Sequence, residues 1–183
     1  MSRSDRLVES FGQFIALPWR EDAAAAQRVV FCVYPENDEL RIRALLGEFE
    51  LTTREAGHDW LGFDLTDTFA HWMAEQKYAK SYFAAPARLS TLLHRYRDWL
   101  EARFLASLQA AGAGPNHVVA LYGVGSLFGF LKVKELVDRL APHVSGRLMV
   151  LFPGSYENDS YRLLDGYDGW NYLATPITAD SAS

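Results

Sequence analysis

The most suggestive chemical feature of the sequence is a glycine-rich segment, with Gly123, Gly125 and Gly129, that directly follows an apolar run. A phosphate-binding loop of the Walker type would carry Lys and then Ser or Thr after its last glycine, to neutralise the phosphates and to hold magnesium. Phe130 and Leu131 stand at those two positions. The cation and the metal ligand of that motif are missing, so we predict no cofactor at this turn.

A dinucleotide-binding turn needs no lysine, because backbone N–H groups and a helix N-terminus hold the pyrophosphate. Its glycines follow the pattern G-x-G-x-x-G, whereas this segment reads G-x-G-x-x-x-G, and no acidic residue ends the next apolar run. The simpler interpretation is a tight strand-to-helix turn that Ser126 caps, with the following aromatic residues in the core. A nucleotide-binding or nucleotide-processing enzyme that uses Gly123, Gly125, Ser126 and Gly129, with nearby acidic loops, stays the alternative.

Carboxylates and aromatic rings gather in a second unusual segment, residues 152–169. Glu157, Asp159, Asp165 and Asp168 could bind a divalent cation or divide acid and base roles. Their spacing lacks the alternating pattern of a calcium loop, and the segment contains no histidine. Because Tyr and Trp are enriched at protein interfaces, we interpret the segment as a recognition surface rather than a catalytic site.

A further aromatic-rich stretch, residues 77–86, is expected to connect two helices. Large apolar side chains exposed to water mark surfaces that a partner covers, and aromatic residues dominate the energetics of such surfaces. The two aromatic segments therefore supply the candidate partner-binding residues. These are Tyr82, Phe83, Tyr156, Glu157, Tyr161, Tyr167 and Trp170.

Other catalytic and metal motifs are incomplete. The five histidines have no H-x-x-x-H or C-x-x-C partner, which disfavours zinc. The one cysteine, Cys32, lies in an apolar run and is expected to be a buried, inert thiol. No nucleophile elbow G-x-S-x-G is present. We therefore predict no catalytic residues, no metal ligands and a chain that is not an enzyme.

The charge of the chain disfavours direct DNA binding. The net charge is −5, whereas nucleic-acid backbones attract clustered Lys and Arg. Basic residues between Arg88 and Arg103 are interpreted as an exposed helix face with pairs such as His94 and Asp98, and DNA contact through them is a third alternative. No apolar stretch reaches the length of a membrane span, and the first residues lack a secretory signal, so a cytoplasmic protein is expected.

Apolar runs rich in β-branched and aromatic residues predict strands, and apolar positions at helical spacing predict helices. Five strands are expected, at residues 28–34, 60–65, 117–122, 147–152 and 170–177. Helices are expected before Pro18, from Asp38 to Gly57, near Phe69 to Met73, from Leu89 to Leu108 and before Pro142. These helices separate the strands or precede them, and they place the glycine turn after the third strand.

This alternation predicts a three-layer α/β fold with a mostly parallel five-stranded sheet and helices on both faces. The fold would be Rossmann-like or a degenerate P-loop-NTPase-like sheet without Walker motifs. Residues 1–178 are expected to form one domain that begins with an amphipathic helix, and 179–183 a disordered tail. Ligands of such sheets bind beyond the carboxyl ends of the strands.

Four stretches of the sequence agree with one known family: ALPW at residues 16–19, and residues 29–74, 118–136 and 146–177. Together they strongly resemble the BrxB family, small proteins encoded in bacterial BREX phage-defence systems. The likeness covers nearly the whole chain, apart from its terminal residues.

The resemblance implies antiviral defence and phage resistance as the context, in systems that methylate host DNA and block unmodified phage. It implies protein partners: the alkaline-phosphatase-like PglZ first, then the ATPase BrxC and the BREX DNA methyltransferase. The family offers no established catalytic residue to carry over. We therefore expect a non-enzymatic adaptor that acts by protein–protein interaction and binds PglZ.

Overall fold

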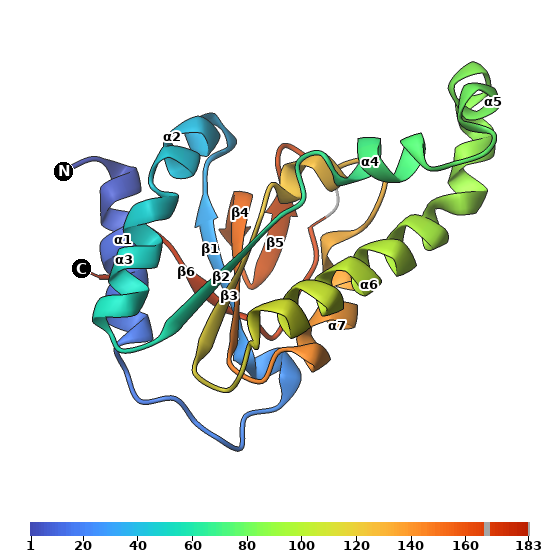
Figure 1. Ribbon diagram of the computed structural model, residues 1–183. Coiled ribbons are helices and arrows are strands. Elements are labelled where there is room, and N and C mark those ends of the chain that lie inside the picture. Colours follow the sequence, from blue (N-terminus) through green and yellow to red (C-terminus); the bar gives the residue numbers. More distant parts are fainter. Residues whose placement is uncertain (167–168, 183) are drawn as a thin grey trace.

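The apolar runs of the sequence form the centre of a mostly parallel sheet in the computed structural model, which describes residues 1–166 and 169–182 (Figure 1). Its main path runs in the order β2-β3-β4-β1-β6, and each neighbouring pair on this path is parallel. These strands are β1 (Val29–Tyr34), β2 (Asp59–Asp64), β3 (His117–Tyr122), β4 (Arg147–Glu157) and β6 (Thr175–Ile177). The predicted α/β fold with a mostly parallel sheet is confirmed.

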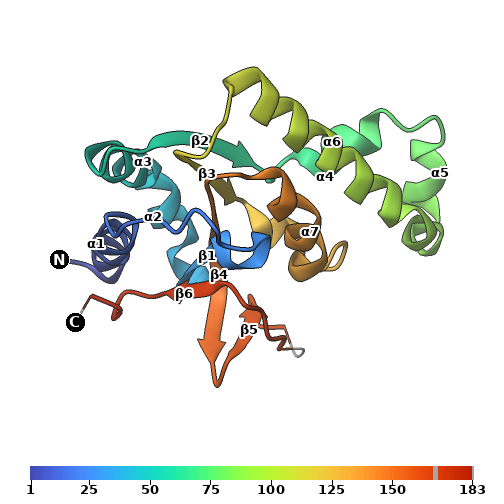
Figure 2. The same ribbon diagram turned by 90° about the horizontal axis from the view of Figure 1, so that it is seen from below.

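Helices cover both faces of the sheet, as expected: α1 and α3 on one side, α6 and α7 on the other (Figures 1 and 2). The helices are α1 (Arg3–Ile15), α2 (Glu39–Ala44), α3 (Leu46–Glu55), α4 (Thr68–Ala74), α5 (Ala79–Ala84), α6 (Leu93–Ala111) and α7 (Val133–Leu140). None of the helices in the described part of the chain is long and apolar enough to cross a membrane.

Two apolar cores result, because successive residues of a strand point to opposite faces. On β1, Val29, Phe31 and Val33 face the core beneath α6 and α7, while Val30 and Cys32 face the core beneath α1 and α3. Cys32 is fully buried, as predicted, and burial raises the pKa of its thiol far above the ordinary value. The thiol therefore stays protonated and packs as a small apolar group.

The region after the fourth strand differs from the expectation. β4 continues to Glu157 and pairs with an antiparallel strand, β5 (Ser160–Leu163), which stands out from the sheet (Figure 2). Asn158 and Asp159 turn the hairpin with φ of 51° and 61°, a two-residue turn that Asn and Asp tolerate. The predicted last strand is shorter than expected, because only Thr175–Ile177 pairs with β1.

Three helical predictions need adjustment. The helix expected from Asp38 to Gly57 is interrupted at Leu45, just before Gly47, a poor helix former, and so becomes α2 and α3. The connection at residues 77–86 contains α5. The long helix begins at Leu93 after the 3₁₀ turn Pro86–Leu92, and ends at Gly112 with a φ of 61°, where a glycine was expected to stop it.

One part of the molecule projects from the sheet. α4 leads outward, α5 lies at the far end, and α6 returns (Figures 1 and 2). Residues 74–95, which we call the arm, contain no buried side chain, whereas α6 becomes buried from Tyr96 onward. The arm is therefore held by its base and not by a core of its own.

Candidate functional site

A pocket of about 330 Å³ lies where ligands of parallel sheets bind, beyond the carboxyl ends of the strands. Loops that follow β1, β2 and β3 contribute to it together with the middle of β4. Its lining consists of Glu36, Glu39, Arg43, Thr66, Gly123, Gly125, Ser126, Pro153 and Leu164. The structure thus brings three of the four predicted turn residues to this pocket, while Gly129 does not line it.

The charged groups at this pocket are bonded to one another. Arg43 donates to Glu39 Oε1 at 3.1 Å and to Asp64 Oδ1 at 3.4 Å, and it also contacts the hydroxyl of Thr66. Asp64 Oδ1 accepts from the Thr66 amide at 2.9 Å and from its hydroxyl at 2.6 Å. Tyr34 donates its hydroxyl to Glu39 Oε2 at 2.5 Å. This network ties the end of β1 to the end of β2 through α2.

The pKa values follow from these contacts. Partial burial acts to raise the pKa of Asp64, but the hydrogen bonds from Thr66 and Arg43 outweigh it, and the net pKa is lowered. Burial, followed by the hydrogen bond to Glu39, raises the pKa of Tyr34 far above its ordinary range. The contacts thus favour the ionised form of Asp64 and the neutral form of Tyr34.

The glycine turn is closed by its own hydrogen bonds. The amides of Ser126 and Phe128 donate to Gly123 O and Gly125 O, both at 3.1 Å, so they are not free to bind a phosphate. The Ser126 hydroxyl lies 2.6 Å from Gly123 O and 3.0 Å from Leu65 O. Ser126 was expected to cap a helix, but this interpretation is wrong: it sits inside the 3₁₀ turn Val124–Leu127, and Lys132 precedes α7.

Gly123 shows why this turn requires glycine. Its φ is 74°, and a Cβ there would lie 2.5 Å from Thr66 Oγ1 and 2.8 Å from Asp64 Oδ1. The residue is thus pressed against the Asp64 and Thr66 turn rather than left open toward a ligand. Gly125 faces Leu164 and Pro153, whose side chains would lie 3.6 Å from an added Cβ. The glycines of this turn therefore serve packing, but the aromatic residues after it are not all in the core as expected, since Phe128 is 47% exposed.

The chemistry that this pocket can support is limited by its charge. Arg43 is balanced by two carboxylates, Glu39 and Asp64, and Glu36 lies at the edge. A phosphate group would meet more negative than positive charge here. Within residues 1–166 and 169–182, no group of three or more His, Cys, Asp or Glu side chains could hold a metal ion.

The predicted acidic loop lies elsewhere. Glu157 and Asp159 are at the tip of the β4–β5 hairpin and do not line the strand-end pocket. Asp159 accepts from the Tyr156 hydroxyl at 3.0 Å, and both line a separate pocket of about 580 Å³ beside Lys134 and Asp138 of α7. These carboxylates therefore cannot act together with the glycine turn.

The aromatic residues of the hairpin region have mainly structural roles. Tyr161 is fully buried, and its hydroxyl donates to Ala174 O at 2.9 Å. Trp170 packs at 5.3 Å from the Tyr161 ring and at 5.8 Å from Phe31 and Phe152. Of the predicted partner-binding residues in this region, Glu157 is exposed, Tyr156 and Trp170 are half-buried, and Tyr167 lies outside the described residues.

The arm exposes the other predicted partner-binding residues. Phe83 is 69% exposed, and its neighbour Tyr78 is 59% exposed. Tyr82 is half-buried and packs against the edge of the core. Two aromatic rings of this projecting segment are thus largely exposed to solvent within the described part of the chain.

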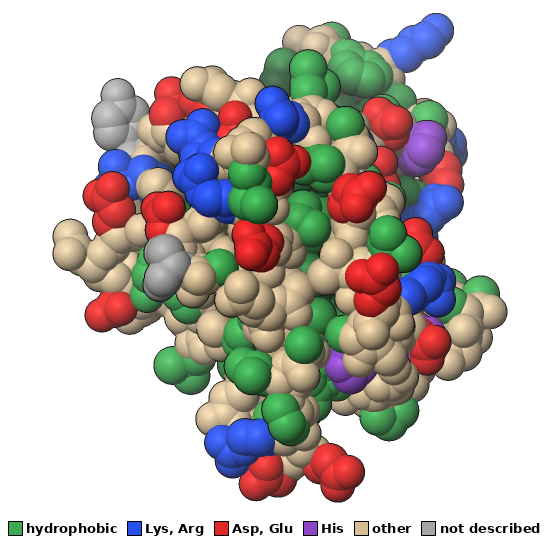
Figure 3. Space-filling model, turned by 90° about the vertical axis from the view of Figure 1, so that its left-hand side faces the viewer, with side chains coloured by type: hydrophobic (Ala, Val, Ile, Leu, Met, Phe, Trp, Pro, Cys, Tyr) green, Lys and Arg blue, Asp and Glu red, His purple; other side chains and the backbone are tan. Residues whose placement is uncertain are grey.

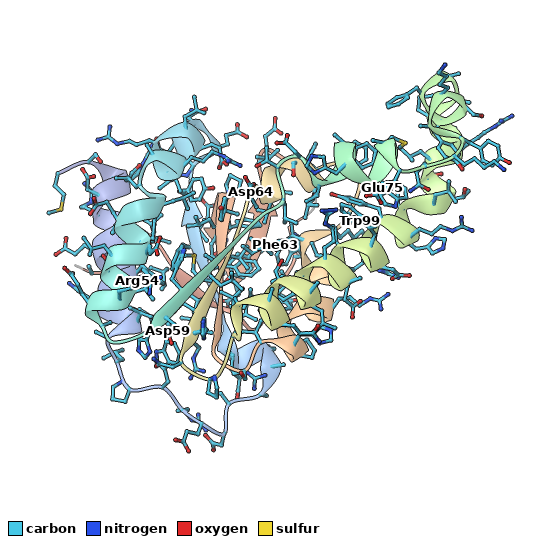
Figure 4. All side chains as sticks on the ribbon, in the orientation of Figure 1. Arg54, Asp59, Phe63, Asp64, Glu75 and Trp99 are labelled. Carbon is cyan, nitrogen blue, oxygen red and sulfur yellow. The ribbon has the colours of Figure 1, made fainter. Side chains whose placement is uncertain are left out.

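The base of the arm is rigidly mounted. Trp99 of α6 donates its indole N–H to Glu75 at 3.0 Å, and Figure 4 shows the two side chains facing each other between α4 and α6. A second, buried contact joins the same two helices, because the hydroxyl oxygens of Thr68 in α4 and Tyr96 in α6 lie 2.7 Å apart. Phe69 stacks on Phe130 with ring centroids 4.2 Å apart. The base therefore fixes the direction in which the arm projects.

Sequence reasoning missed the residues that close the strand-end pocket: Tyr34, Glu39, Arg43 and Thr66. The loops after the strands were correctly expected to lie at one edge of the sheet. The available signal was the i, i+4 spacing of Glu39 and Arg43 directly after the first strand. Pairing of Arg43 with Asp64, 21 positions away, has no local signal.

Comparison with known proteins supports the resemblance noted in the sequence. Searches of curated proteins and of solved structures gave no match. The family model described as "BREX protein BrxB" matches residues 62–176, more than half of the chain, from β2 through the arm and the glycine turn to β6. The chain belongs to the BrxB family of BREX proteins.

Proposed function

We propose that this chain is a non-enzymatic adaptor in a BREX phage-defence complex and that it binds the alkaline-phosphatase-like protein PglZ. Membership of the BrxB family supports a role in a BREX system. The observation that carries the adaptor role is the arm, a projecting segment without buried side chains that exposes Phe83 and Tyr78. Contacts to the ATPase BrxC or to the BREX DNA methyltransferase would make the chain a link within the complex.

The physical argument rests on the cost of leaving aromatic rings in water. Fully burying a Phe side chain contributes roughly 1.5–3 kcal/mol, so covering Phe83 and Tyr78 gives a partner a substantial part of a stable interface. The rigid base favours binding further, because an arm held in one direction loses little conformational freedom on association. The strand-end pocket, by contrast, has its polar groups engaged with one another.

Co-purification with PglZ tests this proposal. The unmodified chain is expected to form a stable complex, and Phe83→Ala is expected to weaken it at least tenfold without lowering the melting temperature. Leu40→Ala is the matched control, because Leu40 is 82% exposed on α2, away from the arm. Failure of the unmodified chain to bind PglZ would contradict the adaptor role. Equal effects of the two variants would contradict the arm as the interface.

The hairpin is tested separately with Tyr156→Ala, since the Tyr156 side chain is half-buried and its hydroxyl reaches Asp159 at the hairpin tip. A weaker complex would place the hairpin in the interface together with the arm. Trp170→Ala is less informative, because this ring packs on Phe31 and Phe152 and its loss would disturb the core.

The position of the strand-end pocket favours one rival, a nucleotide-binding or nucleotide-processing enzyme. A ligand that binds only the folded chain raises its melting temperature by mass action. Thermal unfolding with ATP, GTP, NAD, S-adenosylmethionine and divalent metals separates the two functions. We expect no shift, because the amides of Ser126 and Phe128 and the guanidinium of Arg43 are already bonded; a shift that depends on concentration would favour the rival.

A further inference from the structure

The arm carries a charge opposite to that of the rest of the chain. Between Glu75 and Asp98 there is no acidic residue, but there are five basic ones. These are Lys77, Lys80, Arg88, Arg95 and Arg97. The chain as a whole has a net charge of −5, so the residues outside this stretch together carry −10. Positive charge is therefore concentrated on the arm and at its junction with the rest of α6.

Four of these cations lack a partner on the molecule. Lys77, Lys80, Arg88 and Arg95 are exposed, and none of them forms an ion pair with the described residues. Only Lys77 has a local contact, with its ammonium 5.5 Å from the centre of the Tyr78 ring. Arg97 is the exception, since it lies 3.7 Å from Asp98.

Arginines on the opposite side of the molecule are arranged differently. Figure 3, which shows the face with α1 to α3, has acidic and basic side chains interspersed. The pairs there include Arg3 with Asp38, Arg41 with Asp5, Arg43 with Glu39 and Arg54 with Glu50. The arm thus differs from this face in having four exposed cations close together in the sequence and without ion pairs.

We propose that the arm docks on an acidic patch of a partner protein, with Tyr78 and Phe83 in the centre of the contact and the four cations around them. The inference rests on the proposed adaptor function and adds the chemistry of the partner surface. Interfaces commonly combine aromatic residues in a dry centre with charged residues at a polar rim. Charges at the rim mainly speed association and select the partner.

A protein surface fits the arm better than nucleic acid does. The arm alternates its cations with apolar residues, chiefly alanines, leucines and aromatic rings, which a phosphate backbone would not cover. The net charge of −10 on the residues outside 76–97 would repel a polyanion that extends past the arm, whereas an acidic patch on a protein is local. Duplex and single-stranded DNA are therefore control ligands in the test.

The test measures the affinity of the unmodified chain for PglZ between about 50 and 300 mM salt, and repeats it with Lys77→Glu and Lys80→Glu combined. We expect affinity to fall with salt, and the double variant to bind at least tenfold more weakly at low salt. The matched control is Lys132→Glu with Lys134→Glu, the same charge change on exposed lysines near α7. The control is expected to bind within twofold of the unmodified chain.

Each outcome bears on a different claim. If the affinity for PglZ changes neither with salt nor with the Lys77 and Lys80 substitutions, the acidic-patch inference is overturned and the adaptor function stands. Absence of any complex would overturn both. If labelled DNA binds in a salt-dependent way and the Lys77 and Lys80 variant abolishes this binding, the ligand of the arm is nucleic acid and not an acidic protein. Melting temperatures of both double variants show that neither effect arises from unfolding.

Discussion

Charged side chains at the strand-end pocket are paired with one another, whereas the lysines of the arm have no ion pair among the described residues. In the pocket, Arg43 is held by Glu39, Asp64 and Thr66, and these contacts join the ends of β1 and β2. On the arm, Lys77 and Lys80 have no anionic partner among the described residues. Internally paired groups stabilise the fold, while unpaired groups on a projecting segment are available to another molecule. The comparison shows that, at the position typical of ligand binding, the polar groups are engaged with one another, whereas the cations of the arm are not.

The largest expected loss of stability comes from a substitution beside the strand-end pocket. Gly123→Ala introduces a Cβ at a φ of 74° and within 2.8 Å of Asp64 and Thr66. Left-handed backbone and overpacking together predict a loss of about 3 kcal/mol in the free energy of unfolding. Gly129→Ala is the control, because its φ is 83° but nothing lies within 4 Å of the added Cβ.

Denaturant unfolding measures both glycine variants. Gly129→Ala is expected to cost about 1 kcal/mol, the backbone contribution alone. Equal losses in the two variants would mean that Gly123 does not pack closely on Asp64 and Thr66 at the end of β2, and that the turn has room for a ligand.

A smaller loss is expected from Tyr34→Phe. The buried hydroxyl of Tyr34 donates to Glu39 at 2.5 Å, and its removal leaves the ring in place. Loss of one hydrogen bond to a carboxylate predicts a decrease of about 1–2 kcal/mol in the free energy of unfolding. Binding of PglZ should be unchanged, and a weaker complex would place the pocket rather than the arm in the interface.

Asp64→Asn tests the contacts of Asp64 through the pH dependence of the free energy of unfolding. The pKa of Asp64 is lowered in the folded chain, so its ionised form contributes stability above about pH 4 that is lost as the pH falls through the folded-state pKa. The variant should therefore lose less stability on acidification than the unmodified chain. Since the side chain is 43% exposed, we expect a difference below about 1 kcal/mol. Parallel pH curves would contradict the Arg43 and Thr66 contacts.

The smallest effect on stability belongs to the arm. Phe83→Ala and the paired Lys77 and Lys80 substitutions remove exposed side chains with no buried neighbours in the arm. Such surface substitutions change the free energy of unfolding by less than about 0.5 kcal/mol. Thermal melts check this directly. A marked loss of stability would show that Phe83 or the two lysines pack on the body, as Tyr82 does, and are not open to a partner.

The sheet could be predicted from the sequence because its strands are short apolar runs between turn residues. Runs such as 29–34 and 117–122 have no helical alternative of sufficient length, and helices between them require parallel pairing. The hairpin was missed because β4 continues through Pro153 and Gly154, residues that usually end a strand, and its turn contains no glycine.

The candidate sites were predictable only in part. The exposure of Phe83 could be suspected from its place in an aromatic-rich connection between helices, but the burial of Tyr161 depends on the hairpin folding back over Phe31. Asp98 was expected to pair with His94 on its own helix, yet it pairs with Arg139 of α7 at 2.8 Å. Contacts between elements distant in the chain leave no periodic signal, whereas contacts within one helix do.

The account depends most on the contrast between a pocket that stabilises and an arm that binds. One pair of variants tests it: the affinity for PglZ and the free energy of unfolding, both measured for Phe83→Ala and Tyr34→Phe. We predict that Phe83→Ala loses affinity at unchanged stability and that Tyr34→Phe loses stability at unchanged affinity. The reverse pattern, with affinity lost at the pocket and stability lost at the arm, would contradict the account.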